Sequence, residues 1–393
     1  MGGRHRHLSR ELSNIGHKVT LISARWTHGT RDEIAADNAP ETEEFEGFQF
    51  HRINVHKYKH AHDKKRVLNW FEFAWRIRKL PKKLDEKPDI IIYSSPSLIG
   101  YLGAHYLAKK NRAKLIFEVR DIWPLTLTLL GGFSQKHPFI RFMQWIEDFA
   151  YSKSSNVISN LEGAVEHAKS RGMLAEKFNW IPNGFSEFEL NTIKPASKEI
   201  LESLRHQEFS LTYTGAIGEA NSLDTLIDAA ELLKDSAGVH FNIVGRGRLQ
   251  EKLEQEARDR NLKNVHFWGA VAKNQVQSVL RNSDLCLICW RDSKLYNHGI
   301  AANKLFDYLY AGKPVLNAYS GGYDLISRYQ CGLTVTAESP QALAEGILQF
   351  KEMSPKLREK IGQNGREAVI KNHEYQNIAL KLNSIILNTR SQA

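Results

Sequence analysis

Short apolar segments alternate with amphipathic segments along most of the chain. The apolar segments are rich in β-branched residues, which favours buried strands, whereas the amphipathic segments have helical spacing. Strands are expected at residues 19–23, 48–55, 89–94, 114–119, 156–160 and 179–181, and then at 211–214, 240–244, 265–268, 285–289, 315–316 and 333–335. Residues 25–45 are polar and are expected to form a loop. Strands that alternate with helices predict parallel sheets in an α/β fold.

The rhythm of strands and helices stops and restarts near the middle of the chain. A turn at Pro182-Asn183-Gly184 separates the two series, and 393 residues exceed what one hydrophobic core normally serves. We expect an N-terminal Rossmann-like domain at residues 1–183 and a C-terminal one at 184–372. The last segment, 373–393, is expected to be a helix that returns to the N-terminal domain.

The amino terminus has the pattern of a nucleotide-binding unit whose first strand is missing. A Gly-Gly loop, a helix with Leu8 and Leu12 on one face, and a strand at 19–23 follow each other. The missing strand would be central in a doubly wound sheet, so its neighbours should have unpaired N–H and C=O groups. We interpret this pattern as a start site inside a longer reading frame or as an impaired protein.

Composition indicates the cellular compartment, and charge indicates an acidic binding partner without identifying it. The three cysteines, Cys286, Cys289 and Cys331, are expected to be free thiols, which suit a reducing cytoplasm. Neither a signal peptide nor an apolar window long enough to span a membrane is expected. The formal charge of +10 indicates an acidic partner, which could be phosphate, anionic lipid or nucleic acid.

A basic amphipathic helix is predicted at residues 67–84. Its apolar stripe is formed by Val67, Trp70, Phe71, Ala74, Ile77 and Leu84, and cations crowd around it. Such a helix can lie on an anionic membrane, or it can pack on the sheet with its cations in water. The preceding loop could bind a metal through His56, His60 and His62, although a solvated basic loop is the favoured interpretation.

Two glycine-containing loops follow consecutive strands of the second half. Gly215 and Gly218 come after the strand at 211–214, where they would let the backbone approach a phosphate closely. Arg246 lies between two glycines after the strand at 240–244, at the edge where open α/β sheets bind ligands. Either loop alone is a weak signal.

The most informative segment is 294–317, which reads KLYNHGIAANKLFDYLYAGKPVLN. It predicts a helix with Asn303 as its N-cap and Gly312 as its end. Lys304 places a cation at the positive end of the helix dipole, which is unfavourable by itself. A bound anion such as phosphate would make the position favourable, because it attracts both the ammonium and the free amides of the first turn. Asp307 lies on the same face and could accept the hydroxyls of a ribose. The alternative is a solvated Lys304–Asp307 pair.

Charged and polar residues also follow strands of the first half. Arg120 and Asp121 come after the strand at 114–119 and are expected to face a cleft, with a structural brace as the alternative. Ser95 and Arg4 are expected at the same rim. Since the chain contains no Asp-x-Asp sequence, a bound diphosphate would depend on cations and helix ends rather than on a divalent metal.

Several segments together resemble the bacterial family 4 glycosyltransferases with a GT-B fold, and most nearly the L-fucosamine-type transferases of O-antigen and capsule assembly. They are GGRHRHLSRELSNIGHKVTLIS, KPDIIIYSSPS, KLIFEVRDIWP, WIPNG, YTGAIGEANSLDTLIDAA, VGRGRLQEKL and GIAANKLFDYLYAGKPV. The resemblance implies an acceptor-binding first domain and a donor-binding second domain that face each other across a cleft. It also implies metal-independent transfer, without a cofactor and with retained anomeric configuration.

The resemblance assigns roles to individual residues, and the chain departs from the family in places. Asp307 matches the second of the family's paired acids, whereas Gly299 stands where the first is expected. His298 or Asn297 is therefore the candidate to contact the sugar. Ala216 and Asn221 replace the usual cations of the first phosphate loop, which leaves the diphosphate to Lys304, Asn303, Arg246 and the Gly215–Gly218 turn.

The function predicted from the sequence is transfer of a hexose-type sugar from a UDP-sugar to a lipid-linked or saccharide acceptor, in surface polysaccharide biosynthesis. Arg120, Asp121 and Lys304 are the predicted catalytic residues, and Arg4 and Ser95 are predicted on the acceptor side. The protein is expected in the cytoplasm, with the inner face of the cell membrane as a possible surface. The alternatives are a GT-B nucleotide-sugar epimerase and an impaired or truncated binding protein, and no nucleic-acid recognition motif is present.

Overall fold

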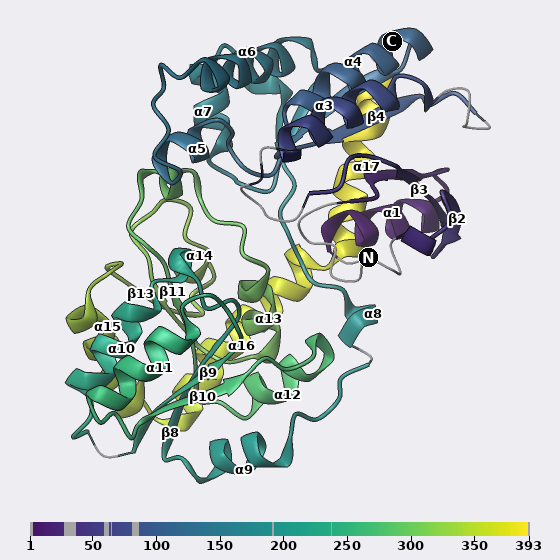
Figure 1. The fold of residues 1–393 in the computed structure, drawn as a ribbon. Helices are drawn as coiled ribbons and strands as arrows, with labels where there is room; N and C mark the ends of the chain where they lie inside the picture. The colour runs from purple at the N-terminus through teal and green to yellow at the C-terminus, as the bar shows by residue number, and fades with distance from the viewer. Residues whose placement is uncertain are drawn as a thin grey trace. The chain divides into compact units, whose positions relative to one another are not determined.

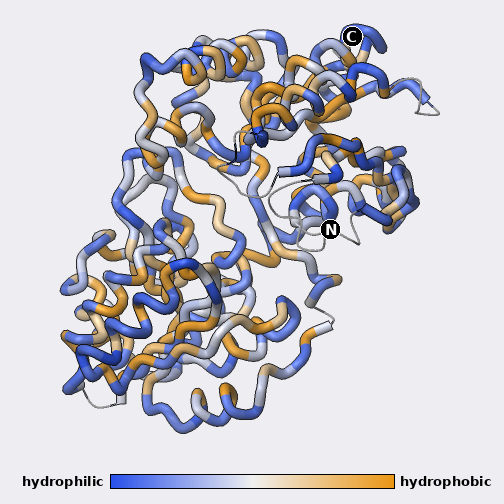
Figure 2. The backbone as a smooth tube through the Cα atoms, viewed as in Figure 1, coloured by the Kyte–Doolittle hydropathy of each residue, from blue (hydrophilic) through white to orange (hydrophobic). Residues whose placement is uncertain are grey.

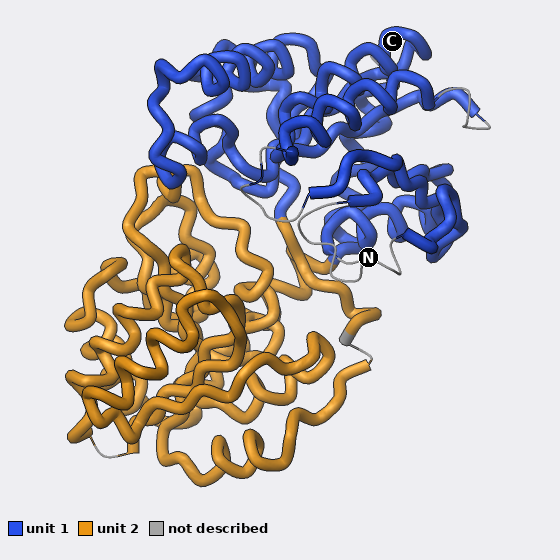
Figure 3. Tube along the Cα trace, in the orientation of Figure 1, with its two compact units in different colours: residues 1–182, 375–393 blue, residues 183–374 orange. Residues whose placement is uncertain are grey.

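The computed structural model describes residues 3–26, 37–58, 63, 65–80, 86–190, 192–236 and 238–391. These residues form two compact units (Figure 3): unit 1 contains Met1–Pro182 and Tyr375–Ala393, and unit 2 contains Asn183–Glu374. The expected boundaries at 183 and 373 thus lie within two residues of the observed ones. His60 and His62, which were considered as metal ligands, lie outside the described residues.

Unit 2 contains a six-stranded parallel sheet in the order β10-β9-β8-β11-β12-β13 (Figure 1). Its strands are β8 (Phe209–Thr214), β9 (Val239–Val244), β10 (Val265–Gly269), β11 (Leu285–Cys289), β12 (Val315–Ala318) and β13 (Gly332–Val335). The chain builds outward from β8 on one side and then returns to build outward from β11 on the other. The order of strands therefore reverses between β8 and β11, where doubly wound sheets bind ligands at their carboxyl edge.

Helices connect and cover the strands of unit 2. They are α8 (Glu187–Leu190), α9 (Lys198–His206), α10 (Leu223–Leu232), α11 (Gln250–Asp259), α12 (Val276–Arg281), α13 (Asn303–Ala311), α14 (Leu325–Tyr329), α15 (Pro340–Glu352) and α16 (Pro355–His373). Every side chain of β8 and β11 is buried, as expected for central strands covered on both faces. The buried hydroxyls of β8 are satisfied: Thr212 bonds Ser283 at 2.6 Å and Ser210 donates to Asp284 at 2.9 Å.

Unit 1 contains two separate sheets. A three-stranded sheet has the order β1-β3-β2, and a four-stranded parallel sheet has the order β4-β5-β6-β7. The strands are β1 (Thr20–Ala24), β2 (Thr42–Phe45), β3 (Phe48–Ile53), β4 (Ile90–Ser94), β5 (Lys114–Val119), β6 (Asn156–Ser159) and β7 (Phe178–Trp180). The prediction of a loop across 25–45 is wrong in part, since Thr42–Phe45 pairs with β3 in an antiparallel hairpin.

The two sheets of unit 1 each end in a strand that has only one partner. Among the described residues, β1 pairs with β3 alone and β4 pairs with β5 alone. Ile92 of β4 is 36% exposed, which is unusual for an apolar residue of a parallel strand. Among the described residues, β1 and β4 are therefore edge strands of their sheets, as β2 and β7 are.

The helices of unit 1 are α1 (Arg4–Asn14), α3 (Lys65–Ile77), α4 (Ile99–Asn111), α5 (Leu125–Leu129), α6 (Pro138–Lys153), α7 (Ala164–Ser170) and α17 (Tyr375–Ser391). In Figure 1, α17 is the yellow helix at the end of the chain, and it lies among the elements of unit 1. Leu382 and Ile386 of α17 share one core with Leu8 of α1 and Ile116 of β5. The final helix thus belongs to the hydrophobic core of the first unit.

Most helices are amphipathic, and Figure 2 shows hydrophobic and hydrophilic residues alternating along them. This pattern follows from one face packing on a sheet while the other meets water. Among the described residues, every helix is too short or too polar to cross a membrane.

Candidate functional site

The two glycine loops of unit 2 pack against each other at the carboxyl edge of the sheet. A Cβ at Gly245 would lie 1.8 Å from the Gly215 carbonyl oxygen, and one at Gly247 would lie 2.1 Å from that of Ile217. The amide of Ile217 donates to the Arg246 carbonyl at 3.0 Å, which holds the loops together. Only glycine at positions 245 and 247 permits this close approach. Because the two loops are in contact, Gly215, Gly218 and Arg246 lie at one rim of the sheet, where the Arg246 side chain is exposed.

Lys304 lies at the start of α13 and reaches this rim. Its ammonium donates to the Tyr213 hydroxyl at 2.8 Å and to Asn221 Oδ1 at 2.6 Å. It also lies 4.3 Å from the centre of the Tyr213 ring and 5.6 Å from that of Trp290, which follows β11. Lys304 therefore bridges the ends of β8 and β11, at the position where the strand order reverses.

The surroundings of Lys304 disfavour its charged form. Burial lowers the pKa of the ammonium from 10.5 to about 7, because apolar and aromatic groups replace water around it. A Cβ at Gly215 would lie 3.2 Å from the Lys304 Nζ atom, so the backbone of the first glycine loop comes close to the ammonium. An anion beside Lys304 would supply the charge that the protein does not provide, and would restore the protonated form.

The start of α13 differs by one residue from the prediction. Ala302 is the N-cap and makes no side-chain cap bond, whereas Asn303 is the first helical residue and is exposed. The proposed N-cap at Asn303 is therefore wrong, because the backbone turns from extended to helical after residue 302. One turn later, the Tyr308 hydroxyl bonds the Thr214 amide at 2.6 Å, which fixes α13 against the end of β8.

Asp307 has a partner that the sequence did not suggest. Both of its carboxylate oxygens lie 2.6 Å from the Lys273 ammonium, and its side chain is 15% exposed. Burial raises the pKa of Asp307, while Lys273 opposes that rise. The alternative of a Lys304–Asp307 pair is wrong, since the two side chains bond different partners. Asp307 remains a candidate for a ribose, with an exposed lysine as its present partner.

Two further residues of unit 2, the predicted His298 and also Arg291, lie between β11 and α13. His298 ends the 3₁₀ helix η5 (Lys294–His298), in the loop that leads into α13, and it is half-buried. Arg291 donates to Asp224 at 2.7 Å and to the Glu219 carbonyl at 3.0 Å. It thus ties the segment after β11 to the segment after Gly218. This tie was not predicted, because Arg291 and Glu219 are distant in sequence.

In unit 1, the segment after β5 is partly a structural brace. Asp121 accepts hydrogen bonds from Thr126 Oγ1 at 2.6 Å and from Trp123 Nε1 at 3.0 Å. Ser95 is 2% exposed, and its hydroxyl oxygen accepts from the Arg120 amide at 2.9 Å. The prediction that Ser95 faces an acceptor is therefore wrong, since burial commits it to holding the loop. The Arg120 side chain is exposed.

Arg4 is also committed to the interior of unit 1. It is 4% exposed and donates to Glu118 Oε1 at 2.8 Å, to the Ile181 carbonyl at 2.7 Å and to the Pro182 carbonyl. The prediction of an acceptor contact at Arg4 is wrong for this reason. Its neighbour His5 is a third exposed and bonds the other Glu118 oxygen at 2.6 Å. His5 was missed because its partner Glu118 is 113 residues away in the sequence.

Replacing Arg4 with methionine should destabilise unit 1 by about 3 kcal/mol, because Glu118 would lose its main partner while buried. Arg4 and His5 hold the pKa of Glu118 well below its usual range, against the effect of burial. Urea unfolding gives the free-energy difference. The matched control is Arg6→Met, whose partly exposed pair with Glu46 should contribute less than about 1 kcal/mol. Equal losses in both variants would contradict this assignment.

A pH dependence of anion binding follows from the lowered pKa of Lys304. Above pH 7 the free site holds a mostly neutral amine, so UDP must bind together with a proton. Above pH 7 the diphosphate is already ionised. We expect the Kd for UDP to rise by up to about tenfold per pH unit above 7, with proton uptake measured by calorimetry in buffers of different ionisation enthalpy. Binding without proton uptake at pH 8 would contradict this expectation.

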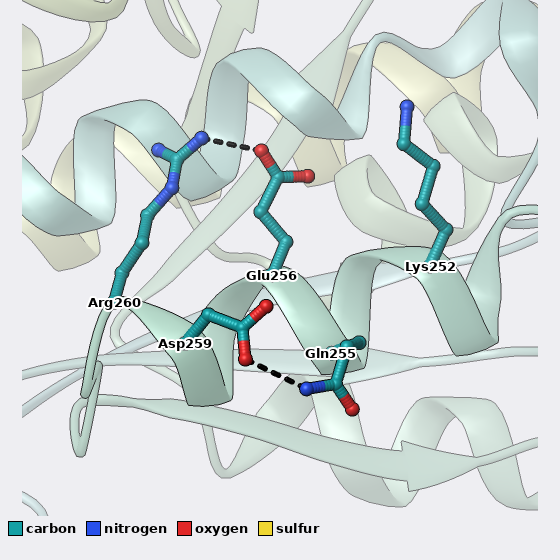
Figure 4. A pocket seen from close by; sticks show the side chains of 5 residues that line it. All are labelled: Lys252, Gln255, Glu256, Asp259 and Arg260. Carbon is teal, nitrogen blue, oxygen red and sulfur yellow. Dashed lines mark hydrogen bonds and ion pairs between the residues drawn. The ribbon is translucent and has the colours of Figure 1, made fainter.

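A second feature of unit 2 is a hollow beside α11, shown in Figure 4. Its lining side chains are Lys252, Gln255, Glu256, Asp259 and Arg260. They come from the same stretch of chain and bond each other, as Arg260 does with Glu256 and Gln255 does with Asp259 at 2.7 Å. Since the polar groups of Gln255, Glu256, Asp259 and Arg260 already bond partners, this hollow is a weaker candidate than the rim around Lys304.

Comparisons with known proteins agree with this two-unit arrangement. Residues 1–184 match the family described as "Glycosyl transferase 4-like domain", and residues 197–368 match "Glycosyl transferases group 1". The chain is 26% identical over 273 residues to the putative colanic acid biosynthesis glycosyl transferase WcaI of Escherichia coli K12. It is 29% identical over 173 residues to the uncharacterized glycosyltransferase MJ1178 of Methanocaldococcus jannaschii. These alignments cover 67% and 44% of this chain, and 66% and 46% of the relatives.

Solved structures share the fold over nearly the whole chain. Sucrose-phosphate synthase from Thermosynechococcus elongatus aligns with a TM-score of 0.72 at 16% identity, over 99% of this chain and 93% of that one. HepE from Anabaena, solved with UDP-glucose, aligns with a TM-score of 0.67 at 15% identity, over 99% and 97%. The chain has the GT-B fold, and it is a glycosyltransferase that joins a glycosyl transferase 4-like domain to a glycosyl transferases group 1 domain.

Proposed function

We propose that this glycosyltransferase moves a sugar from a UDP-sugar to a lipid-linked or saccharide acceptor in surface polysaccharide biosynthesis. The observation that carries the proposal is Lys304, a desolvated ammonium between the ends of β8 and β11 and beside two interlocked glycine loops. Such a position suits a diphosphate, because helix amides and an ammonium both favour negative charge. The complexes of HepE with UDP and UDP-glucose, and the relation to WcaI, support the choice of donor and pathway.

In this proposal unit 2 holds the donor. The diphosphate accepts from Lys304 and from the backbone of the Gly215–Gly218 turn, with Arg246 and the amino end of α13 at Asn303 nearby. Asp307 accepts from the ribose hydroxyls after exchanging Lys273 for them, and His298 contacts the sugar. The diphosphate is held by these groups without a metal ion.

The bond that breaks joins the anomeric carbon of the sugar to the β-phosphate oxygen. Negative charge grows on the leaving diphosphate, so the groups around it stabilise the transition state more than the ground state. The acceptor oxygen forms the new bond on the same face, and its proton passes to the leaving phosphate oxygen. This route retains the anomeric configuration and uses no protein nucleophile.

Unit 1 is proposed to hold the acceptor. Arg120 is the exposed candidate there, and Asp121 acts as a positioning residue because Trp123 and Thr126 occupy its carboxylate. His5, a third exposed beside the buried Glu118, joins Arg120 as an acceptor-side candidate. We place the protein in the cytoplasm, where nucleotide-sugars are available. The narrower assignment to L-fucosamine-type transferases stays a prediction.

The test is a panel of radiolabelled UDP-sugars, incubated with and without membrane lipid extracts, with EDTA present throughout. The proposal expects label in the lipid or saccharide fraction from one donor, and retained configuration in the product by NMR. Conversion of the donor to an isomer without any acceptor would instead favour the epimerase alternative. Transfer that requires a divalent ion would overturn the metal-free part of the proposal.

A further inference from the structure

Unit 1 exposes aromatic side chains from three helices. On α3, Phe71 is 47% and Trp75 is 57% exposed, Tyr106 of α4 is 42% exposed, and Trp145 of α6 is 53% exposed. Solvent-exposed aromatic side chains on neighbouring helices are uncommon in a protein whose surface meets only water. We call these four residues together with Phe142 of α6 the aromatic face.

Ring stacking and one shared arginine link the members of the aromatic face across the three helices. Phe71 stacks on Phe142 with ring centres 6.2 Å apart, and Phe142 stacks on Trp145 at 6.1 Å. The Arg78 guanidinium lies 4.9 Å from the Trp75 ring and 4.2 Å from the Tyr106 ring, which joins α3 to α4. Figure 1 shows α3, α4 and α6 at the same end of unit 1.

This arrangement changes the interpretation of the basic helix. The sequence placed Trp70 and Phe71 in one apolar stripe, yet of these two only Trp70 turns inward, where it contacts Trp123 with ring centres 5.5 Å apart. Phe71 and Trp75 are exposed instead. Helix α3 therefore has an inner apolar face that packs on unit 1 and an outer aromatic face that its own unit leaves uncovered.

Positive charge predominates on the helices that carry the aromatic face. The cations on the three helices and directly after α3 are Lys65, Arg66, Arg76, Arg78, Lys79, Lys109, Lys110, Arg141 and Lys153. The acids on the same helices are already engaged: Glu72 pairs with Arg76, Glu147 is buried against Tyr151, and Asp148 pairs with Arg171. A second copy of this chain would bring the same cations into opposition, whereas an anionic surface would neutralise them.

We propose that the aromatic face docks unit 1 on the surface of an anionic lipid bilayer. Trp, Tyr and Phe insert at the boundary between headgroups and acyl chains, while arginine and lysine bind the headgroup phosphates. Neither the aromatic residues nor the cations alone suffice for stable attachment, but together they supply both contributions. The inference stands apart from the proposed transfer reaction, because docking requires neither donor nor acceptor.

Sedimentation of the full chain with lipid vesicles tests the proposal. The chain should sediment with vesicles of phosphatidylcholine mixed with phosphatidylglycerol, and much less with phosphatidylcholine alone. The triple variant Phe71→Ser, Trp75→Ser and Trp145→Ser should lower the partition coefficient at least about tenfold. The double variant Lys109→Glu and Lys110→Glu leaves the rings intact and should lower it roughly thirtyfold.

The matched control replaces exposed apolar residues of unit 2, Leu232→Ser and Leu357→Ser, and should bind vesicles as the wild type does. Circular dichroism of each variant verifies that unit 1 is folded, and UDP calorimetry does the same for unit 2. The proposal is overturned if the wild type ignores anionic vesicles, or if both the aromatic and the charge variants bind them unchanged. A dimer that the triple variant abolishes, without vesicle binding, would assign the face to self-association and also overturn it.

Discussion

Replacing Lys304 with alanine is expected to lower the turnover number about a hundredfold or more, the scale observed when one donor to a developing oxyanion is removed. The ammonium lies between the ends of β8 and β11, desolvated by Tyr213 and Trp290. A charge in such surroundings interacts more strongly with a phosphate oxygen than it would in water. Since the negative charge grows during the reaction, the turnover number should fall more than the affinity for the UDP-sugar. Steady-state kinetics with the donor identified by the panel gives both quantities.

Two variants make the Lys304 prediction specific. Lys252→Ala removes an exposed lysine beside the α11 hollow and should leave turnover unchanged. Lys304→Met retains most of the side-chain volume between Tyr213 and Trp290, so it separates loss of charge from loss of packing. It should be as inactive as the alanine variant. If Lys304→Met retains wild-type turnover, the ammonium has no part in catalysis and the assignment fails.

The second large effect is expected at Asp307. Replacing it with alanine should weaken UDP binding about thirtyfold to a hundredfold, because two hydrogen bonds from ribose hydroxyls to a charged acceptor would be lost. In the structure both carboxylate oxygens contact Lys273, so a simple loss of that ion pair must be distinguished from a loss of ligand contacts. Calorimetry with UDP on Asp307→Ala and Lys273→Ala separates the two effects. Lys273→Ala should change the Kd by less than about threefold, since that lysine is exposed and replaceable by water.

A change in the ligand completes this comparison. UDP that lacks both ribose hydroxyls should bind the wild type as weakly as UDP binds Asp307→Ala, and the variant should not discriminate between the two ligands. This double cycle isolates the contact between the carboxylate and the hydroxyls. Were the variant still to prefer the intact ribose by the wild-type margin, Asp307 would hold the fold through Lys273 and would not bind the nucleotide.

The order of strands and helices could be predicted because hydrophobic spacing depends on the local conformation of the backbone. Apolar runs located the strands, and the turn at Pro182-Asn183-Gly184 located the division between units to within one residue. The glycine loops and Lys304 were found at one rim because residues that follow parallel strands emerge at the same edge of a sheet.

The errors concern side chains whose partners are far away in sequence. Arg4 reads as an exposed cation until Glu118 and the carbonyls of residues 181 and 182 are seen to bury it. From the sequence, Asp307 could pair with Lys304 on the same helix face, but in the structure its carboxylate bonds Lys273. The stripe on α3 was drawn from spacing alone, which cannot tell an inner apolar face from an outer one. In each case tertiary packing decided which side chains remain available for a ligand.

The most direct test of the whole account is a crystal structure of the protein soaked with its UDP-sugar donor. The account predicts a diphosphate oxygen within hydrogen-bond distance of the Lys304 ammonium, about 3 Å, with the Gly215–Gly218 backbone alongside. It also predicts that Lys273 has moved from Asp307 to admit the ribose. A nucleotide bound elsewhere, for example beside Lys252 on α11, with Lys304 still bonded only to Tyr213 and Asn221, would contradict it.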